Sequence, residues 1–170
     1  MKNNKKMYAL IMIGVISVLA TGCSLSGVKL SNEPATVNTN QGEVKTDVNL
    51  DLSSRNLEKL EMSVFEKSEL ESLNISNNNL SDALPSQIGN LKNLKVLNAS
   101  NNSFTGVPAE LGQLTKLEVL DFSNNSLTGL PNELGELKNL KTFNISGNDF
   151  SEQDLNGIRE KLPNTEFITE

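Results

Sequence analysis

Residues 119 to 131 read VLDFSNNSLTGLP, and near-copies of this stretch lie on both sides of it. Residues 96 to 108 read VLNASNNSFTGVP, and residues 72 to 85 read SLNISNNNLSDALP, which is one residue longer. Leu70, Leu94, Leu117 and Leu140 mark the same point in successive copies, at intervals of 24, 23 and 23 residues. A fixed period of this length predicts a solenoid, in which each copy forms one coil and contacts only its neighbours.

Each copy contains a short alternating segment that predicts a β-strand. In Leu73-Asn74-Ile75 the alternation sends the two apolar side chains to one face and the amide to the other. The equivalent triplets are Leu97-Asn98-Ala99, Leu120-Asp121-Phe122 and Phe143-Asn144-Ile145. Because each triplet recurs one coil later, the strands are expected to stack as a parallel sheet with a spacing of ~4.8 Å. No coil can bury its apolar side alone, so stacking creates one continuous core.

A second apolar set predicts the opposite, convex side of each coil. Its members are Leu84, Ile88 and Leu91 in one coil, Val107, Leu111 and Leu114 in the next, and Leu130, Leu134 and Leu137 in the third. Pro85, Pro108 and Pro131 stand where short helical segments would begin. Proline is tolerated there because an N–H in the first helical turn has no partner to lose.

The four segments LESLNISNNNL, LKVLNASNNSF, LEVLDFSNNSL and LKTFNISGNDF resemble the leucine-rich repeat family. The segments LPSQIGNLK, VPAELGQLT and LPNELGELK that complete three of these copies resemble the variant found in plant receptor ectodomains and many bacterial repeat proteins. The resemblance implies an α/β solenoid, a curved right-handed stack of about five coils of 23–24 residues. A parallel sheet would form its concave face, short helical or 3-10 segments its convex face, and a helix its C-terminal cap. The usual function of the family is protein binding.

An asparagine stands at the end of each strand segment, at Asn78, Asn102, Asn125 and Asn148. Its amide can both donate and accept hydrogen bonds, so it can satisfy backbone groups of its own coil and of the next one. The resemblance implies that these four residues form a structural Asn ladder rather than a ligand-binding site.

The two ends of the repeat array are expected to differ from its middle, because terminal repeats need caps. Residues 47–69 fit an atypical N-terminal cap repeat, in which Arg55 stands where the ladder would have asparagine. Residues 70–150 form the core repeats. Residues 151–170 are expected to form the C-terminal cap, with a helix that begins after Ser151 and stops before Pro163, followed by a last short strand in residues 165–169.

The N-terminus has the layout of a secretory signal peptide over residues 1–22, with a basic start, an apolar run and small residues at its end. A membrane-spanning helix needs about 20 apolar residues, and this run is shorter, so a retained transmembrane anchor is the weaker interpretation. Cys23 is the only cysteine and follows Leu-Ala-Thr-Gly. This arrangement resembles the lipobox of bacterial lipoproteins, although Ala20 stands where leucine is commoner; the alternative is an incidental or buried thiol.

The lipobox implies that Cys23 carries fatty acyl chains such as palmitate, and two or three chains anchor a protein stably. The protein would then lie in the bacterial cell envelope, outside the cytoplasm, on the outer face of the plasma membrane or on the outer membrane. Residues 23–46 lack a sustained apolar period and predict a disordered tether between the lipid and the repeat domain.

Composition argues against two classes of function. Removing residues 1–22 leaves 12 basic against 21 acidic residues and a net charge of −9, which would repel nucleic-acid phosphates. The chain has no histidine and its only cysteine would be lipidated, which excludes Ser–His–Asp and Cys–His catalysis. No metal-ligand spacing and no phosphate-binding glycine loop is present in the sequence, so we expect neither an enzyme nor a metal or other cofactor.

The remaining candidate site is the concave face, whose outward positions form columns along the coils. The expected binding columns are Asn49, Ser72, Val96, Val119 and Thr142; Asp51, Asn74, Asn98, Asp121 and Asn144; and Ser53, Ser76, Ser100, Ser123 and Ser146. A fourth column contains Ser54, Asn77, Asn101, Asn124 and Gly147. These columns lack the Trp, Tyr and Arg side chains that usually dominate binding energy, which favours weak binding.

The sequence therefore predicts a membrane-anchored, extracytoplasmic recognition module that is not an enzyme and that binds a protein or a cell-surface polymer. The alternatives are a structural spacer without a specific ligand, or a repetitive surface that binds polysaccharide or ice. Ice-binding surfaces usually present threonine, and only Thr142 does so here.

Overall fold

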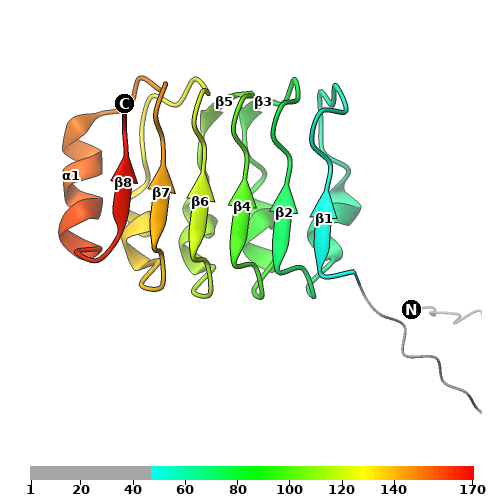
Figure 1. The fold of residues 1–170 in the computed structure, drawn as a ribbon, viewed down its shortest axis with the longest axis horizontal. Coiled ribbons are helices and arrows are strands. Elements are labelled where there is room, and N and C mark those ends of the chain that lie inside the picture. The colour runs from blue at the N-terminus through cyan, green and yellow to red at the C-terminus, as the bar shows by residue number, and fades with distance from the viewer. Residues whose placement is uncertain (1–46) are drawn as a thin grey trace, which may run out of the picture. The chain divides into compact units, whose positions relative to one another are not determined.

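The computed structural model describes residues 47–170, which form a stack of parallel coils (Figure 1). The signal peptide expected at residues 1–22 and the lipidated tether expected at 23–46 lie outside the described residues. No helix within residues 47–170 is long and apolar enough to cross a bilayer.

A six-stranded parallel sheet runs along the whole stack (Figure 1). Its strands, in spatial order, are β1 (Asn49–Asp51), β2 (Ser72–Asn74), β4 (Val96–Asn98), β6 (Val119–Asp121), β7 (Thr142–Asn144) and β8 (Glu166–Ile168). The apolar middle residues of these strands stand opposite one another, from Leu50 beside Leu73 to Phe143 beside Phe167. The predicted sheet of short strands is confirmed, and each strand is only three residues long because the chain turns back once per coil.

The other side of each full coil is a five-residue 3-10 turn. The turns are η1 (Met62–Glu66), η2 (Ser86–Asn90), η3 (Ala109–Gln113) and η4 (Asn132–Glu136). Pro85, Pro108 and Pro131 each stand immediately before a turn, and their carbonyl groups accept its first backbone hydrogen bond. The turns stack closely, since a Cβ atom built on Gly112 would lie 2.2 Å from the carbonyl oxygen of Glu133.

The hydrophobic core fills the space between the sheet and the turns as one continuous cluster. All nine apolar residues predicted for the convex side are buried, and so are Ile75, Ala99, Phe122 and Ile145 at the ends of the strand triplets. Phe104 and Phe122, from adjacent coils, pack edge to face with ring centres 6.0 Å apart. The apolar side chains of each coil are thus buried against those of the neighbouring coils, as in other solenoids.

The C-terminal end is closed by helix α1 (Glu152–Lys161), which buries Leu155 and Ile158 against the last coil. Ser151 caps the helix by accepting a hydrogen bond from the Asp154 N–H. At the N-terminal end, Leu50, Leu52, Leu57 and Leu60 of the first coil are only partly buried against the core, because no described residue packs outside them.

A second, two-stranded sheet is formed by β3 (Ser81–Ala83) and β5 (Ser103–Gly106). It lies behind the upper ends of the main strands in Figure 1. These strands were not expected from the sequence, because their residues are mostly polar and show no repeated alternation. Their pairing is parallel and shifts register between Asp82 and Ala83, in the copy of the repeat that is one residue longer.

Candidate functional site

The concave face is defined here as the face of the six-stranded sheet that is turned away from the 3-10 turns. Its first two columns are set by strand pairing, which joins Ser72 to Val96 and Asn74 to Asn98 and continues in the same register along the sheet. Strand β8 adds Glu166 to the first column and Ile168 to the second. The sequence predicted the last strand but not these two site positions, although the alternation in Glu166-Phe167-Ile168 indicates them.

The side chains of the second column form hydrogen bonds with the backbone at the ends of their own strands. In every coil from Asp51 to Asn144, a side-chain oxygen of the column residue accepts a hydrogen bond from the serine N–H two residues later, at 2.8–3.2 Å. The Ser53 N–H is the main reason that the pKa of Asp51 lies below its ordinary value. Such local bonds hold the strand-to-loop turn in place and reduce the capacity of the column to bind a ligand.

The third column differs from its expected role as a contact surface. Ser76, Ser100 and Ser123 are only 4–6% exposed, and Ser53 and Ser146 are half-buried. The hydroxyl groups of Ser76 and Ser100 donate to the column residue two positions earlier, at 2.8 and 2.7 Å. The chain already turns inward at these serines, so the three central ones offer little surface to a ligand.

The fourth column is explained by backbone conformation. Ser54, Asn77, Asn101, Asn124 and Gly147 all have positive φ angles, between 52° and 68°. Asparagine and glycine adopt this left-handed conformation more readily than other residues. Their repetition along the stack therefore reflects the turn that each coil makes, and sequence columns alone do not reveal this requirement.

The four residues Asn78, Asn102, Asn125 and Asn148 make the same set of hydrogen bonds in each coil. The Asn125 Nδ2 donates to the carbonyl groups of Ala99, Phe122 and Ser123 at 2.9–3.2 Å, and its Oδ1 accepts from the Phe104 N–H at 3.0 Å. Each amide thus joins its own coil to the preceding one. These side chains point into the stack and not toward the concave face.

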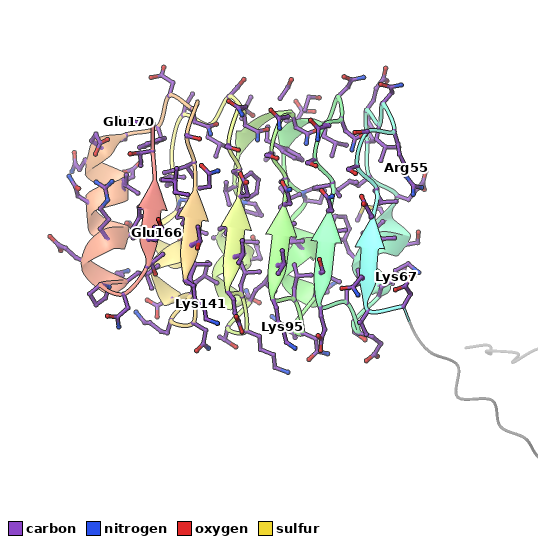
Figure 2. All side chains as sticks on the ribbon, in the orientation of Figure 1. Arg55, Lys67, Lys95, Lys141, Glu166 and Glu170 are labelled. Atoms are coloured by element: carbon purple, nitrogen blue, oxygen red, sulfur yellow. The ribbon has the colours of Figure 1, made fainter. Side chains whose placement is uncertain are left out.

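Charged residues line the lower edge of the sheet, where the loops from the 3-10 turns enter the strands; Lys95 and Lys141 are labelled there in Figure 2. Lys95 pairs with Glu71 at 2.8 Å, and Lys141 pairs with Glu118 at 2.5 Å. The hydrogen bond from Lys141, together with its charge, holds the pKa of Glu118 below its ordinary value. Acidic and basic side chains therefore alternate along this edge, and each pair joins two neighbouring coils.

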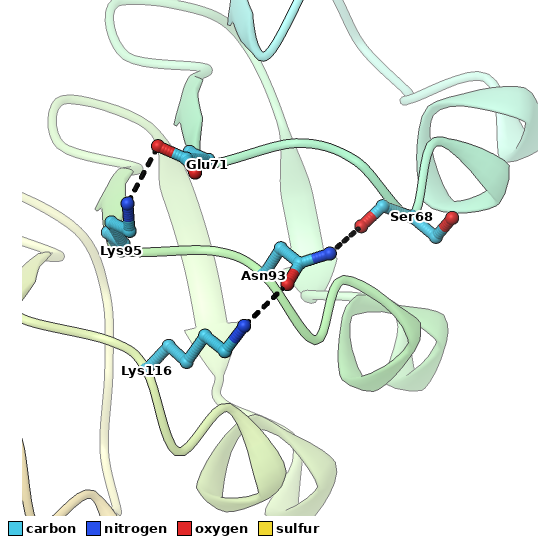
Figure 3. Close-up of polar contacts among 5 residues, drawn as sticks. All are labelled: Ser68, Glu71, Asn93, Lys95 and Lys116. Atoms are coloured by element: carbon cyan, nitrogen blue, oxygen red, sulfur yellow. Dashed lines mark hydrogen bonds and ion pairs between the residues drawn. The ribbon is translucent and has the colours of Figure 1, made fainter.

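A row of neutral and basic side chains lies beside these ion pairs (Figure 3). The Asn93 Nδ2 donates to the Ser68 carbonyl at 3.0 Å, and the Lys116 Nζ donates to the Asn93 Oδ1 at 2.7 Å. Asn139 repeats this bond to the Thr115 carbonyl two coils further on. The lower edge is therefore a set of contacts between coils, with most of its polar atoms already bonded.

The accessible part of the concave face is small. Its first two columns stand two residues, about 7 Å, apart, and six strands span about 24 Å, which gives a few hundred Å² at most. A standard protein interface buries about 800 Å² per partner. Residues 47–170 contain no group of three or more acidic, histidine or cysteine side chains that could hold a metal ion.

The family model for the leucine-rich repeat region matches residues 48–168. The chain belongs to the leucine-rich repeat family. Domains of this family typically bind proteins and are generally not catalytic. No curated protein matches the chain closely enough to count as a relative.

Solved structures of the family resemble this leucine-rich repeat protein in sequence as well as in fold. A leucine-rich repeat protein of Leptospira interrogans is 32% identical, with a TM-score of 0.57, over 70% of this chain and 36% of the other. The ectodomain of the receptor kinase SOBIR1 from Arabidopsis thaliana is 34% identical, with a TM-score of 0.59, over 71% of this chain and 67% of the other. An internalin of Listeria monocytogenes, at 24% identity and a TM-score of 0.57, shares the fold. This chain spans about a third of the Leptospira protein.

Proposed function

We propose that this leucine-rich repeat protein is a lipid-anchored module of the bacterial cell envelope that binds a protein outside the cytoplasm. The sequence Leu-Ala-Thr-Gly before Cys23 supports the anchor, and family membership supports protein binding. The observation that carries the proposal is the position of the repeat domain, which begins 24 residues after Cys23 and contains its whole core. A tethered domain with a core of its own is suited to reach a partner beyond the membrane surface.

The small concave face implies that one copy binds weakly. Its first column contains only two apolar side chains in its centre, Val96 and Val119, and the side-chain oxygens of the second column already accept hydrogen bonds within the strand ends. Weak sites become effective when many copies share one surface, because each further contact is then intramolecular. A lipid anchor supplies this condition by holding many copies in one membrane.

The anchor is tested by producing the full chain in a bacterium and measuring the mass of the N-terminal peptide. We expect cleavage before Cys23 and the addition of two or three acyl chains, with the protein in the membrane fraction. The variant Cys23→Ser should lose the added mass and leave the membrane. An unmodified Cys23 in the membrane fraction would show that the anchor is wrong.

Protein binding is tested by crosslinking envelope extracts to polypeptide 24–170, which contains every described strand and the whole core. The variant Val96→Arg/Val119→Arg blocks the centre of the concave face at two half-buried positions without removing a hydrogen bond. The matched control Thr128→Arg/Asn156→Arg adds the same charge at two exposed positions off the sheet. We expect the control, and not the concave-face variant, to retain the partner. Equal capture by both variants would exclude the concave face.

A structural spacer is the second candidate, and one observation favours it. In each coil from Asp51 to Asn144, the side-chain oxygen of the second column accepts a hydrogen bond from the backbone of its own strand end. A surface whose polar groups bond mainly to one another needs no ligand for stability. Failure of wild-type polypeptide 24–170 to capture any protein would support the spacer.

A further inference from the structure

Strand β3 is paired on one side only. It bonds to β5. The first coil bonds only to the segment that leads into β3, through the hydrogen bond from the Asn79 N–H to the Leu57 carbonyl at 2.8 Å. Among the described residues, no backbone hydrogen bond joins residues 58–60 to β3. All three residues of β3 are exposed, which is true of no other three-residue strand described. The edge of β3 is therefore open to another strand.

The directions of the backbone groups on β3 show what this edge offers. The Leu80 carbonyl accepts from the Ser103 N–H at 2.8 Å, and the Leu84 N–H donates to the Gly106 carbonyl at 3.3 Å. Because successive residues of a parallel strand direct their backbone groups to opposite sides, the N–H and C=O groups of Ser81 and Ala83 face away from β5. Only an extended backbone can pair with this alternating set of donors and acceptors.

A hollow of about 240 Å³ lies between this edge and the first coil. We call it the β3 slot, and its apolar lining consists of Leu60, Met62, Leu80, Ala83, Pro85 and Phe104. Met62 is 48% exposed, and it is one of two large hydrophobic side chains among the described residues that are exposed; the other is Ile168. An apolar cavity of about 150 Å³ can hold a benzene ring, so the slot has room for one large apolar side chain.

The charges at the rim of the slot indicate which residue type of a ligand would lie next to that apolar side chain. Glu58 and Asp82 contribute two carboxylates and Lys59 contributes one ammonium group, so the rim is net negative. Asp82 has a φ angle of 61°, which places this carboxylate at the irregularity in the β3 pairing.

We propose that the β3 slot binds an extended peptide of a partner protein, which adds a strand to β3 and inserts one large apolar side chain next to a lysine or arginine. This inference rests on the proposed protein-binding function and gives it a site other than the concave face. The open strand edge supplies backbone pairing, the hollow supplies the apolar pocket, and the acidic rim selects the basic neighbour.

The probe for this proposal is a displayed library of random nine-residue peptides, selected on polypeptide 24–170. We expect the enriched peptides to share a Leu, Met or Phe next to Lys or Arg. Met62→Glu should weaken a synthesised peptide from this set at least about tenfold, because it places a charge on the apolar rim. The matched control Ile168→Glu makes the same change at the other exposed hydrophobic residue and should leave affinity unchanged. Melting curves of both variants would show that the fold is retained.

Methylation of the peptide backbone separates strand addition from simple filling of the hollow. Methyl groups on the nitrogen atoms that face β3 should abolish binding, and methyl groups on the alternate nitrogen atoms should not. Equal tolerance of both patterns would overturn strand addition, and failure to enrich any peptide would overturn the slot as a peptide site. If the wild type associates with itself and Met62→Glu abolishes that association, the slot binds a second copy of this chain, which would overturn the proposed partner. If the peptides still bind Met62→Glu but no longer bind Val96→Arg/Val119→Arg, the protein-binding site is the concave face. This result would overturn the β3 slot and leave the proposed protein-binding function standing.

Discussion

The side-chain oxygen of Asn125 accepts a hydrogen bond from the backbone N–H of Phe104 at 3.0 Å, and these two residues belong to successive coils. The Phe104 ring itself is buried against Phe122. One amide thus fixes the loop that brings an aromatic ring of the preceding coil into the core. This link between polar pairing and apolar packing is repeated at Asn102 and Asn148.

We expect Asn125→Ala to lower the free energy of unfolding by about 1–3 kcal/mol, because the backbone N–H and carbonyl groups that it serves lose their partner. Chemical denaturation followed by circular dichroism measures the change. The control is Asn124→Gly, at an exposed neighbouring residue with a φ angle of 52°, which glycine adopts without strain. Equal stability of Asn125→Ala and the wild type would contradict the role of this amide.

Gly147→Ala and Gly157→Ala should change stability in opposite directions. Gly147 has a φ angle of 68°, and a Cβ atom there would lie 2.6 Å from the Asn124 Oδ1, so alanine should destabilise by at least about 1–2 kcal/mol. Gly157 lies inside α1, and the nearest atom to its added Cβ is 3.7 Å away. Alanine there should stabilise by about 0.5–1 kcal/mol, because glycine is a poor helix former. Melting temperatures that move in the same direction for both variants would contradict this assignment.

Lys141→Ala should raise the pKa of Glu118 toward its ordinary value, because it removes both the hydrogen bond and the nearest positive charge. An NMR titration of the Glu118 side chain measures this shift. The matched control Lys138→Ala should have no such effect, since Lys138 bonds to the carbonyl groups of Gly135 and Lys161.

The sign of the pH effect follows from the direction of this shift. Folding lowers the pKa of Glu118, so the ion pair stabilises the protein above the ordinary glutamate pKa, and this contribution disappears as the pH falls through the lowered value. The Lys141 and Glu118 side chains are 70% and 39% exposed, so solvent screens the pair and the melting temperature should change little. A large loss of stability in Lys141→Ala would show that the pair contributes more than its exposure allows.

Ser151→Ala should weaken the C-terminal cap by about 0.5 kcal/mol, at the low end of the range for an N-cap residue. The low value follows from the long hydrogen bond, 3.5 Å from the Asp154 N–H to the Ser151 Oγ. Hydrogen exchange of the α1 backbone amides should accelerate first, because α1 covers the end of the stack. Unchanged exchange in α1 would show that packing of Leu155 and Ile158 holds the helix without the cap.

The sequence by itself determined the coils, the main sheet and the C-terminal helix. The period of 23–24 residues places an apolar residue at the same point of every coil, and such a residue can be buried only against its neighbours. Short-range alternation was enough to identify strands such as Leu73-Asn74-Ile75, because one face of the sheet is the core. The same periodicity identified which polar residues form each column of the concave face.

Only the tertiary structure decided which of those polar positions reach the solvent. Ser100 and Asn101 are adjacent in sequence, yet the serine is buried and the asparagine is exposed with a positive φ angle. The turn at the end of the strand sets this difference, and it depends on hydrogen bonds to the next coil, such as that from the Asn101 N–H to the Ser123 carbonyl. The open edge of β3 was equally hidden, because it results from the path of the first coil. Burial follows from periodicity along one chain, whereas accessibility depends on what the neighbouring coils leave uncovered.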